Sequence, residues 1–491
     1  MAAPSRHGPV PVTGNTQNPE IVLTAVNAGY IHASLGLRSL YANLGDLRGR
    51  SCIAEGTRRL GIPELARFIA GLNPSIVGVS VSIWNHRESR ELLERLAQDL
   101  PQAWLVVGGP EASYLPDDHP LFTRAHVLVR GEGEEVFPRL CRELLGIPGP
   151  HGSPDPGLVS GSESVPRRTG HLRVIQARQP DPAHLELPYG FLEDRDLSNR
   201  LMYIETSRGC PFSCEFCLSS VQGRVREFPL KPVLDQVTRL YERGGRYFKV
   251  IDRTFNLDLD RARRTLTFFR ELFLGNPREG AYVQFEVVPD RLPQELREPI
   301  AAFPPGTLRL EVGIQTLNNA VAARINRKQD QPRTLDNLAF LSEQTGAVIH
   351  ADLIIGLPGE DLESFARGFD RLWQLQPGEI QLGVLKALPG TTLHRHDGPW
   401  GMVFNPDPPY EIMQTGAMNR DTMDKMKVAA KFWELVVNRG RYPEEVGRLN
   451  PPKEGAFYRF LALSEYLYNR LGRTWGIDAS ELRALLATYP G

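Results

Sequence analysis

Short apolar runs of strand length alternate with amphipathic helical segments along most of this chain, and this alternation constrains the fold more than any other feature. In the first part of the chain, the strand candidates are residues 20–26, 75–83, 104–109 and 126–130. Strands that are apolar throughout and separated by helices are typical of a parallel sheet with helices on both faces. We therefore predict an α/β, Rossmann-like domain at residues 20–145.

A second alternation begins at residue 201. It contains six strand candidates, which are residues 201–206, 246–252, 282–288, 308–314, 348–355 and 379–386. Six βα units predict a partial (β/α)6 barrel of the TIM type, and in such folds the functional residues lie at the carboxyl ends of the strands. We expect this domain to cover residues 201–395.

The remaining segments differ in composition from these two regions. Residues 1–19 lack the apolar stretch of a signal peptide and are expected to form a disordered leader. Residues 146–200 are rich in Pro, Gly and Ser and are interpreted as a linker that holds one short strand at 171–177. Residues 396–491 are predicted to form a mainly helical domain, with Met423 and Met426 in its core.

Composition excludes several classes of protein. The formal net charge of −1 gives no electrostatic reason to expect a nucleic acid or an anionic membrane as partner. No apolar run approaches the roughly 18 to 20 residues that span a bilayer. The five cysteines are clustered rather than spaced as a disulfide framework, so we expect a reduced, cytoplasmic location.

Three of the five cysteines, Cys210, Cys214 and Cys217, have the spacing C-x3-C-x2-C directly after a strand candidate. Thiolates select zinc, copper(I) or iron–sulfur. A structural zinc site needs four ligands, and the nearest histidines in the sequence are His184 and His350. A zinc site completed by Asp or Glu and a group of buried structural cysteines remain alternatives. The interpretation we favour is a [4Fe–4S] cluster with one open iron, because catalytic metal sites keep an open position.

The motif "CPFSCEFC" resembles that of the radical S-adenosylmethionine (SAM) enzymes, and the resemblance covers nearly the whole predicted barrel. In that family the open iron binds SAM, which is cleaved reductively to a 5′-deoxyadenosyl radical. The resemblance implies that the three cysteines are the cluster ligands and that Phe216 packs near the adenine. It also implies SAM contacts by Asp252 near the methionine amino group, by Glu311 and Gln315 near ribose or methionine, and by Gly356 near adenine.

Two glycine-containing segments, "VVGGPEAS" at 106–113 and "VRGEGEE" at 129–135, follow strand candidates of the first domain. Ligands of doubly wound sheets bind at this edge, although neither segment is a G-x-G-x-x-G nucleotide fingerprint. With "TAVNAGYIHASLGLRSL" and "VSVSIWN", they resemble the cobalamin (B12)-binding domain of the cobalamin-dependent radical SAM branch. The C-terminal segment resembles the helical tail of an uncharacterised subgroup of that branch. The implied cobalamin-binding residues are Asn27, Ser80, Gly108, Gly109, Glu111, Gly131, Glu132 and Gly133.

One motif of other cobalamin proteins, D-x-H-x-x-G, is not matched around His32, because Tyr30 stands where the aspartate would be. We interpret His32 as a loop or pocket residue rather than a cobalt ligand. A domain that has lost cobalamin and serves only as a scaffold remains an alternative.

The resemblance implies a cobalamin-dependent radical SAM enzyme, and among the activities of that branch we favour methyl transfer to an unactivated carbon or phosphorus. Radical cyclisation or rearrangement without methyl transfer is one alternative. A non-catalytic cobalamin or iron–sulfur sensing protein is another. The expected partners are a small-molecule or peptide substrate and an external electron donor such as flavodoxin or ferredoxin. We expect no membrane or nucleic-acid partner.

Overall fold

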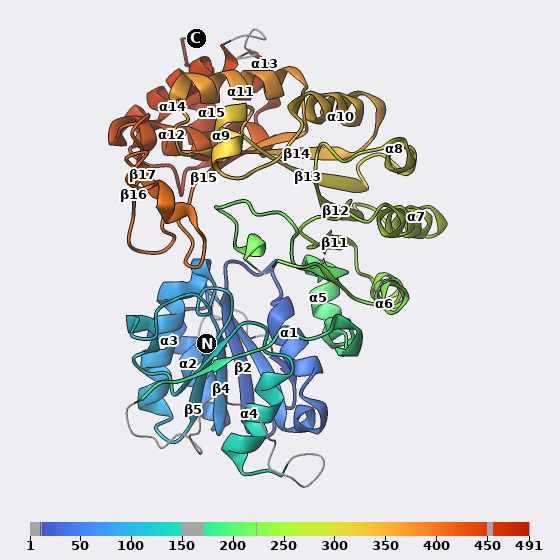
Figure 1. The fold of residues 1–491 in the computed structure, drawn as a ribbon, viewed down its shortest axis with the longest axis vertical. Helices are drawn as coiled ribbons and strands as arrows, with labels where there is room; N and C mark the ends of the chain where they lie inside the picture. The colour runs from blue at the N-terminus through green and yellow to red at the C-terminus, as the bar shows by residue number, and fades with distance from the viewer. Residues whose placement is uncertain (1–9, 11, 149–170, 222, 449–454, 491) are drawn as a thin grey trace, which may run out of the picture. The chain divides into compact units, whose positions relative to one another are not determined.

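The structure is a computed structural model that describes residues 10, 12–148, 171–221, 223–448 and 455–490. The chain divides into two compact units, one of residues 1–204 with 226–247 and one of residues 205–225 with 248–491 (Figure 1). Most of the predicted leader and residues 149–170 of the predicted linker lie outside the described residues. The division into a leader, three domains and a linker stays a prediction.

The first unit is built around a seven-stranded sheet of order β1-β3-β2-β4-β5-β6-β7. The strands are β1 (Val12–Gly14), β2 (Ile21–Asn27), β3 (Ser51–Thr57), β4 (Ile76–Ser80), β5 (Trp104–Gly108), β6 (Val127–Arg130) and β7 (Arg173–Gln176). β1 is antiparallel to β3, and the other strands pair in parallel. The strand order reverses between β2 and β4, so the sheet has the switch point at which doubly wound folds bind their ligands.

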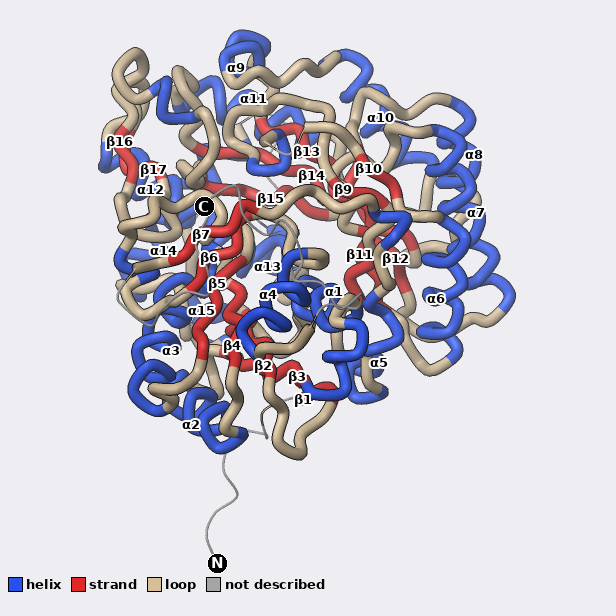
Figure 2. The backbone as a smooth tube through the Cα atoms, turned by 60° about the horizontal axis from the view of Figure 1, so that its bottom comes forward, coloured by secondary structure: helices blue, strands red, loops and turns tan. Residues whose placement is uncertain are grey.

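Helices cover both faces of this sheet. They are α1 (Leu35–Ala42), α2 (Ile62–Leu72), α3 (His86–Asp99) and α4 (Val136–Leu145), with α5 (Asp194–Asn199) and α6 (Leu230–Glu242) also in this unit. Residues of α2 and α3 share one buried core with β2 and β4. Residues of α1 and α4 share a second core with the opposite face (Figure 2). The predicted Rossmann-like α/β fold is confirmed.

The second sheet has six strands in the order β15-β14-β13-β12-β11-β8. They are β8 (Met202–Ile204), β11 (Tyr247–Val250), β12 (Tyr282–Val287), β13 (Leu308–Gln315), β14 (Val348–Ile355) and β15 (Glu379–Val384). β12 to β15 pair in parallel. The intervening helices include α7 (Leu259–Gly275), α8 (Gln294–Ala301), α9 (Asn319–Arg324), α10 (Gln331–Gln344) and α11 (Leu362–Gln374). Each strand matches one of the six sequence candidates, and the predicted partial barrel is confirmed.

The C-terminal region is mainly helical, as predicted, and it covers the edge strand β15. Its elements are β16 (Val403–Phe404), β17 (Ile412–Gln414), α12 (Arg420–Trp433), α13 (Pro443–Arg448), α14 (Ala456–Leu471) and α15 (Ala479–Ala487). Trp433 Nε1 and Asn438 Nδ2 donate to the carbonyl oxygen of Ile380 on β15, at 2.8 and 3.0 Å. Met423 and Met426 are fully buried, as expected for core residues.

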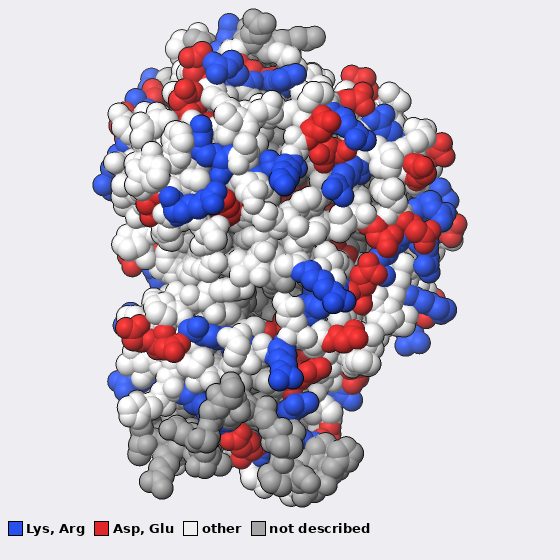
Figure 3. All heavy atoms as spheres, viewed as in Figure 1, with Lys and Arg blue, Asp and Glu red and all other residues white. Residues whose placement is uncertain are grey.

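The surface carries both signs of charge. On the face drawn in Figure 3, acidic and basic side chains are interspersed, in keeping with the net charge of −1. Among the described residues, no helix combines the length and the apolar character needed to cross a bilayer.

Candidate functional site

The three cysteines lie on one tight loop. Cys210 and Cys214 are each 8% exposed, and Cys217 is half-buried. The backbone N–H of Cys210 donates to Gly223 O at 3.2 Å, and that of Cys217 donates to Cys214 O at 3.1 Å. Gly209 precedes the loop at φ 91°, and a Cβ there would lie 2.5 Å from Arg224 O. The loop therefore requires glycine at this position.

The thiols influence one another. Burial raises the pKa of the Cys210 thiol, and charge on Cys217 and Cys214 raises it further, so the three sulfurs lie within electrostatic range. Burial also raises the pKa of Cys214, while the Arg327 guanidinium opposes that rise. In the described part of the chain, no three His, Cys, Asp or Glu side chains converge on one ion position. The donor set on this loop is three thiols, which fits the cysteine ligands of an iron–sulfur cluster.

Asp252 holds the chain segment that leads into the cysteine loop. Its side chain is buried and accepts four hydrogen bonds. They come from the N–H and Oγ1 of Thr206, at 2.7 and 2.5 Å, and from the N–H and Oγ of Ser207, at 3.0 and 2.9 Å. Burial raises the pKa of Asp252 although these hydrogen bonds oppose the rise. Both carboxylate oxygens thus have partners within the chain, and contact of Asp252 with SAM stays a prediction.

Glu215, inside the cysteine motif, is a buried residue that sequence reasoning missed. Its carboxylate contacts His396 Nε2 at 2.6 Å and forms an ion pair with Arg395 Nη2. Its backbone N–H donates to Ile325 O at 3.2 Å. Because these partners lie more than 100 positions away in the sequence, no local pattern could have revealed them.

The other predicted SAM residues lie on or beside the barrel strands. Glu311 accepts from Lys249 Nζ at 2.6 Å and from Gln284 Nε2 at 2.9 Å. Gln315 has a φ of 71° where the β13–β14 register shifts, and non-glycine residues rarely adopt such a φ. Phe216 is half-buried in the cysteine loop.

Gly356 follows β14 with φ 90°. A Cβ there would lie 2.7 Å from Ile412 Cγ2 and 3.1 Å from Met423 Cε. Packing against the C-terminal region therefore already requires glycine here, and an approach of this backbone to adenine stays a prediction.

Carboxyl groups lie on three neighbouring strands of the barrel, and sequence reasoning did not identify them as a group. Glu286 pairs in register with Glu311, and Asp352 pairs with Gly313. Burial, followed by the charges of Glu311 and Glu286, raises the pKa of Asp352 well above its usual range. Asp352 Oδ1 is buried and has no hydrogen-bond partner among the described residues.

All eight predicted cobalamin residues lie at the carboxyl ends of β2, β4, β5 and β6, at one edge of the first sheet. Asn27 Nδ2 donates to Glu55 Oε1 at 2.9 Å, and the carbonyl oxygen of Ser80 lies 3.4 Å from Asn85 Nδ2. Gly109 has φ 105°, and a Cβ there would lie 2.5 Å from Val81 O. Packing inside the domain thus explains this glycine without a ligand.

The neighbouring glycines are also close to the chain itself. A Cβ on Gly108 would lie 3.3 Å from Val129 O, one on Gly131 3.3 Å from Ala177 O, and one on Gly133 2.9 Å from Leu40 Cδ2. A Cβ at these three positions would be tight but not excluded by its neighbours, and the contact of these glycines with cobalamin stays a prediction.

The two predicted acidic residues have partners within the first unit. Glu111 is buried, with Oε1 3.0 Å from His86 Nδ1. Glu132 forms a bidentate ion pair with Arg226. Arg226 Nη1 lies 3.2 Å from Oε2, and Nη2 donates to Oε1. His32 Nδ1 lies 2.6 Å from the hydroxyl of Tyr203.

Exposed apolar side chains at the same edge were not predicted to bind a ligand. Tyr30 and Ile31 follow β2 and are 48% and 47% exposed, and Trp84 follows β4 and is 50% exposed. These two strands flank the switch point of the sheet. The edge therefore offers apolar surface to a large ligand at the position where doubly wound folds bind one.

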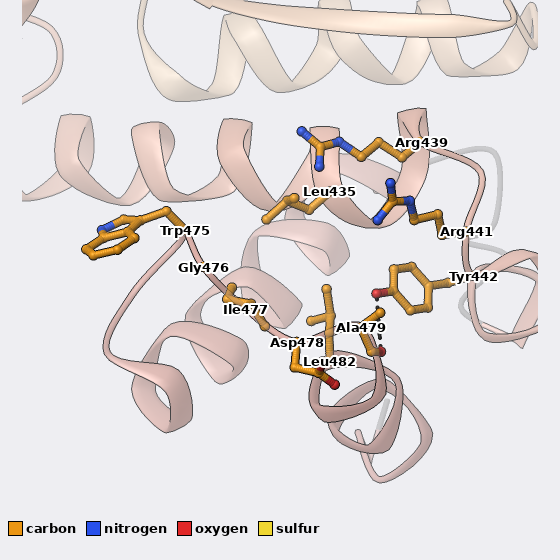
Figure 4. Close-up of a pocket in the computed structure, with 10 residues that line it drawn as sticks. All are labelled: Leu435, Arg439, Arg441, Tyr442, Trp475, Gly476, Ile477, Asp478, Ala479 and Leu482. Atoms are coloured by element: carbon orange, nitrogen blue, oxygen red, sulfur yellow. Dashed lines mark hydrogen bonds between the residues drawn. The ribbon is translucent and has the colours of Figure 1, made fainter. Parts of the chain in front are cut away.

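A pocket of about 220 Å³ lies in the C-terminal region, between the segment after α12 and the start of α15 (Figure 4). Trp475, which is 78% exposed, and Arg441 contribute to its lining. None of the predicted site residues lines this pocket.

Comparison with known protein families identifies both of the predicted α/β domains. Residues 21–141 match the B12 binding domain, and residues 204–372 match the Radical SAM superfamily. At the level of the domains, these matches confirm the predicted cofactors, which are cobalamin, SAM and a [4Fe–4S] cluster.

Two curated relatives are methyltransferases. The chain is 26% identical over 399 residues to 2-(S-pantetheinyl)-carbapenam-3-carboxylate methyltransferase of Streptantibioticus cattleyicolor, which covers 74% of this chain and 56% of that protein. It is 27% identical over 398 residues to cobalamin-dependent radical SAM methyltransferase TokK of Streptomyces tokunonensis, covering 73% of this chain and 56% of that protein. The chain thus spans little more than half the length of these relatives.

A solved structure shares the fold across nearly the whole chain. The cobalamin-dependent S-adenosylmethionine radical enzyme OxsB, with aqua-cobalamin bound, superposes with a TM-score of 0.63 at 15% identity, over 96% of this chain and 75% of that one. The chain thus carries a B12 binding domain followed by a domain of the Radical SAM superfamily, and it shares the fold of a cobalamin-dependent radical SAM enzyme.

Proposed function

We propose that this protein is a cobalamin-dependent radical SAM methyltransferase. The observation that carries the proposal is the loop of Cys210, Cys214 and Cys217, which offers three thiols and no fourth cysteine and follows the first strand of a radical SAM barrel. When bound, the cluster and SAM supply one-electron cleavage of SAM to a 5′-deoxyadenosyl radical, and cobalamin supplies a methyl carrier.

The residues of this chain would bind and orient these groups. The three cysteines would ligate the cluster and leave one iron open for SAM. Asp252 would hold the loop through Thr206 and Ser207 rather than act as an acid or base, because its oxygens already accept four hydrogen bonds. Glu311, Gln315, Gly356 and Phe216 are the proposed SAM contacts.

Cobalamin would lie at the carboxyl edge of the first sheet. The predicted residues at the ends of β2, β4, β5 and β6 would surround it, and exposed Tyr30, Ile31 and Trp84 would contact its apolar face. This position follows from the switch point between β2 and β4. His32 stays interpreted as a loop residue, and its hydrogen bond to Tyr203 supports that interpretation.

Methyl transfer is favoured over the other activities of the family because both curated relatives named above are methyltransferases. The proposed acceptor is an unactivated carbon or phosphorus of a small molecule or peptide. The proposed electron donor is a flavodoxin or ferredoxin. The clustered thiols of the loop support a reduced, cytoplasmic location.

The test is anaerobic reconstitution with iron, sulfide and cobalamin, followed by reduction and incubation with methyl-labelled SAM. We expect 5′-deoxyadenosine to form and label to reach cobalamin. Formation of 5′-deoxyadenosine without transfer of label to any acceptor would favour a cyclase or rearrangement enzyme. Bound cobalamin without any SAM cleavage would favour a sensing protein.

Cys214→Ala is the first variant to measure, because it removes one proposed ligand. We expect it to lose bound iron and SAM cleavage while its circular dichroism stays that of the wild type. Cys141→Ala is the matched control, because Cys141 lies on α4 and is buried in the core of the first unit, and the variant should keep full iron. Wild-type iron content in Cys214→Ala would contradict the cluster assignment.

A further inference from the structure

Three consecutive residues, Ile325, Asn326 and Arg327, run beside the cysteine loop and contact it at three successive positions. Ile325 O accepts the backbone N–H of Glu215 at 3.2 Å. Asn326 Nδ2 donates to the Oγ of Ser213 at 2.6 Å and to its carbonyl oxygen at 3.2 Å. Arg327 Nη1 lies 3.7 Å from the Sγ of Cys214. The segment that follows α9 is therefore built against the middle of the motif.

The guanidinium of Arg327 is held by partners on each of its three nitrogens. Besides Cys214 Sγ, Nη2 donates to Gly313 O, and Nε donates to Gln329 Oε1 at 2.9 Å. Gly313 lies at the register shift of β13, and a Cβ there would lie 3.5 Å from Arg327 Nη2. The rigid fork of arginine is thus fixed in one orientation, with one N–H aimed at the sulfur.

A guanidinium in this position favours negative charge on the sulfur. Arginine stays protonated at every accessible pH, and Nη1 of Arg327 lies 3.7 Å from the Cys214 sulfur. The reduction potential of an iron–sulfur cluster depends on its net charge and on hydrogen bonds to its sulfurs. Reduction adds one electron and breaks no bond in the cluster, so a cation beside a ligand sulfur stabilises the reduced form.

We propose that Arg327 is a positioning residue that orients Cys214 and raises the reduction potential of the cluster that Cys210, Cys214 and Cys217 would hold. This inference rests on the proposed function, since it requires a cluster on this loop. The electron comes from the external donor, and Arg327 takes no part in transferring it.

The test is a potentiometric titration of the reconstituted full-length protein with dithionite, followed by electron paramagnetic resonance of the reduced cluster. Arg327→Gln removes the charge and the fork. We expect unchanged iron and sulfide content and, at a fixed ambient potential, a ratio of reduced to oxidised cluster about tenfold lower. For a one-electron couple this corresponds to a midpoint about 59 mV more negative.

Arg324→Gln is the matched control, because it removes the same charge from the same segment. Arg324 stacks on Trp400 at 3.8 Å and donates to Pro358 O at 2.8 Å, away from the sulfur contact. Its midpoint should equal that of the wild type. Arg327→Lys retains the charge without the fork and should shift the midpoint in the same direction by less.

A midpoint in Arg327→Gln equal to that of Arg324→Gln, at full iron content, would overturn the proposal. If Arg327→Gln fails to take up iron, Arg327→Met, which also removes the charge, takes its place, and a wild-type midpoint there overturns the tuning role. Failure of the wild-type protein to take up a four-iron cluster would instead overturn the proposed function, so the two failures are distinguishable.

Discussion

At the scale of single residues, Glu360 shows how burial changes the chemistry of a carboxyl group. Its side chain is 2% exposed, and Oε1 accepts from Thr316 Oγ1 at 2.5 Å, while Oε2 is buried without a hydrogen-bond partner among the described residues. Burial raises the pKa of Glu360 from 4.5 to about 7. Sequence reasoning singled out the nearby Gly356 but did not identify the buried carboxyl of Glu360.

This pKa predicts a pH dependence of stability with a definite sign. Between pH 4.5 and about 7 the folded protein keeps a proton on Glu360 that the unfolded chain has lost, so the free energy of unfolding falls as pH rises through this window. Because a pKa difference of one corresponds to about 1.36 kcal/mol, the free energy of unfolding should fall by roughly 3 kcal/mol across this window. Urea unfolding of Glu360→Gln at pH 5 and pH 8 should show a shallower fall than the wild type.

The exposed Glu343→Gln on α10 is the control and should leave the difference between the two pH values unchanged. Other buried carboxyls, Asp352 and Glu286 among them, titrate in both proteins, so only the difference between variant and wild type is informative. An identical pH slope in Glu360→Gln would show that this carboxyl is not protonated in the folded state.

At the scale of elements, apolar runs identified most strands of both sheets, but β1 and β3 were missed. β1 lies within the predicted leader, and the sequence of β3, "SCIAEGT", carries a glutamate where an internal strand would be apolar. Glu55 is nonetheless 2% exposed, because Arg38 and Arg200 reach its Oε2 at 2.9 and 3.5 Å. The residues that compensate its charge come from distant segments, and a local pattern cannot reveal them.

The buried ion pairs of Glu55 make the stability of β3 depend on the charge of this carboxylate. Burial alone would raise the pKa of Glu55, but Arg38 holds it below its usual value, so the carboxylate stays ionised. Glu55→Gln would remove the nearer charged partner of Arg38, itself 2% exposed, and leave it paired with Asp196 at 3.5 Å. We expect the free energy of unfolding to fall by about 3–5 kcal/mol, as for other buried pairs broken on one side.

Urea unfolding followed by circular dichroism at pH 7 measures this loss. Glu94→Gln removes an exposed partner of Arg90 on α3 and should change the free energy by no more than about 0.5 kcal/mol. Equal effects of the two substitutions would mean that the buried cluster contributes no more than a surface ion pair.

At the scale of the whole molecule, the sequence located the cysteine loop and the edge of the first sheet that is proposed to bind cobalamin, because both depend on residues close together in the chain. It did not locate Arg327 beside Cys214 or His396 beside Glu215, because folding brings these pairs together across more than 100 positions. Gly109 and Gly356 were predicted to contact ligands; contacts within the chain already require glycine at both positions, and the ligand contacts stay predictions.

The division into two compact units leads to a final prediction about cofactor binding. The proposed cobalamin residues belong to the first unit, and the three cysteines belong to the second. Loss of the cluster should therefore leave cobalamin affinity intact. A ligand that binds only the folded state stabilises it by about 2.7 kcal/mol at 100 times its dissociation constant. Hydroxocobalamin should stabilise the cluster-loaded wild type and the cluster-free Cys214→Ala equally, in anaerobic thermal unfolding scans.

Hydrogen exchange would locate the effect. Protection on adding hydroxocobalamin should increase at the carboxyl ends of β2, β4, β5 and β6 in both proteins. Trp84→Ala should weaken the stabilisation without changing the cobalamin-free protein, because Trp84 is half exposed at this edge and leaves no core cavity when truncated. If Cys214→Ala abolished the stabilisation by cobalamin, the two sites would be coupled, and an assignment of one cofactor to each unit would fail.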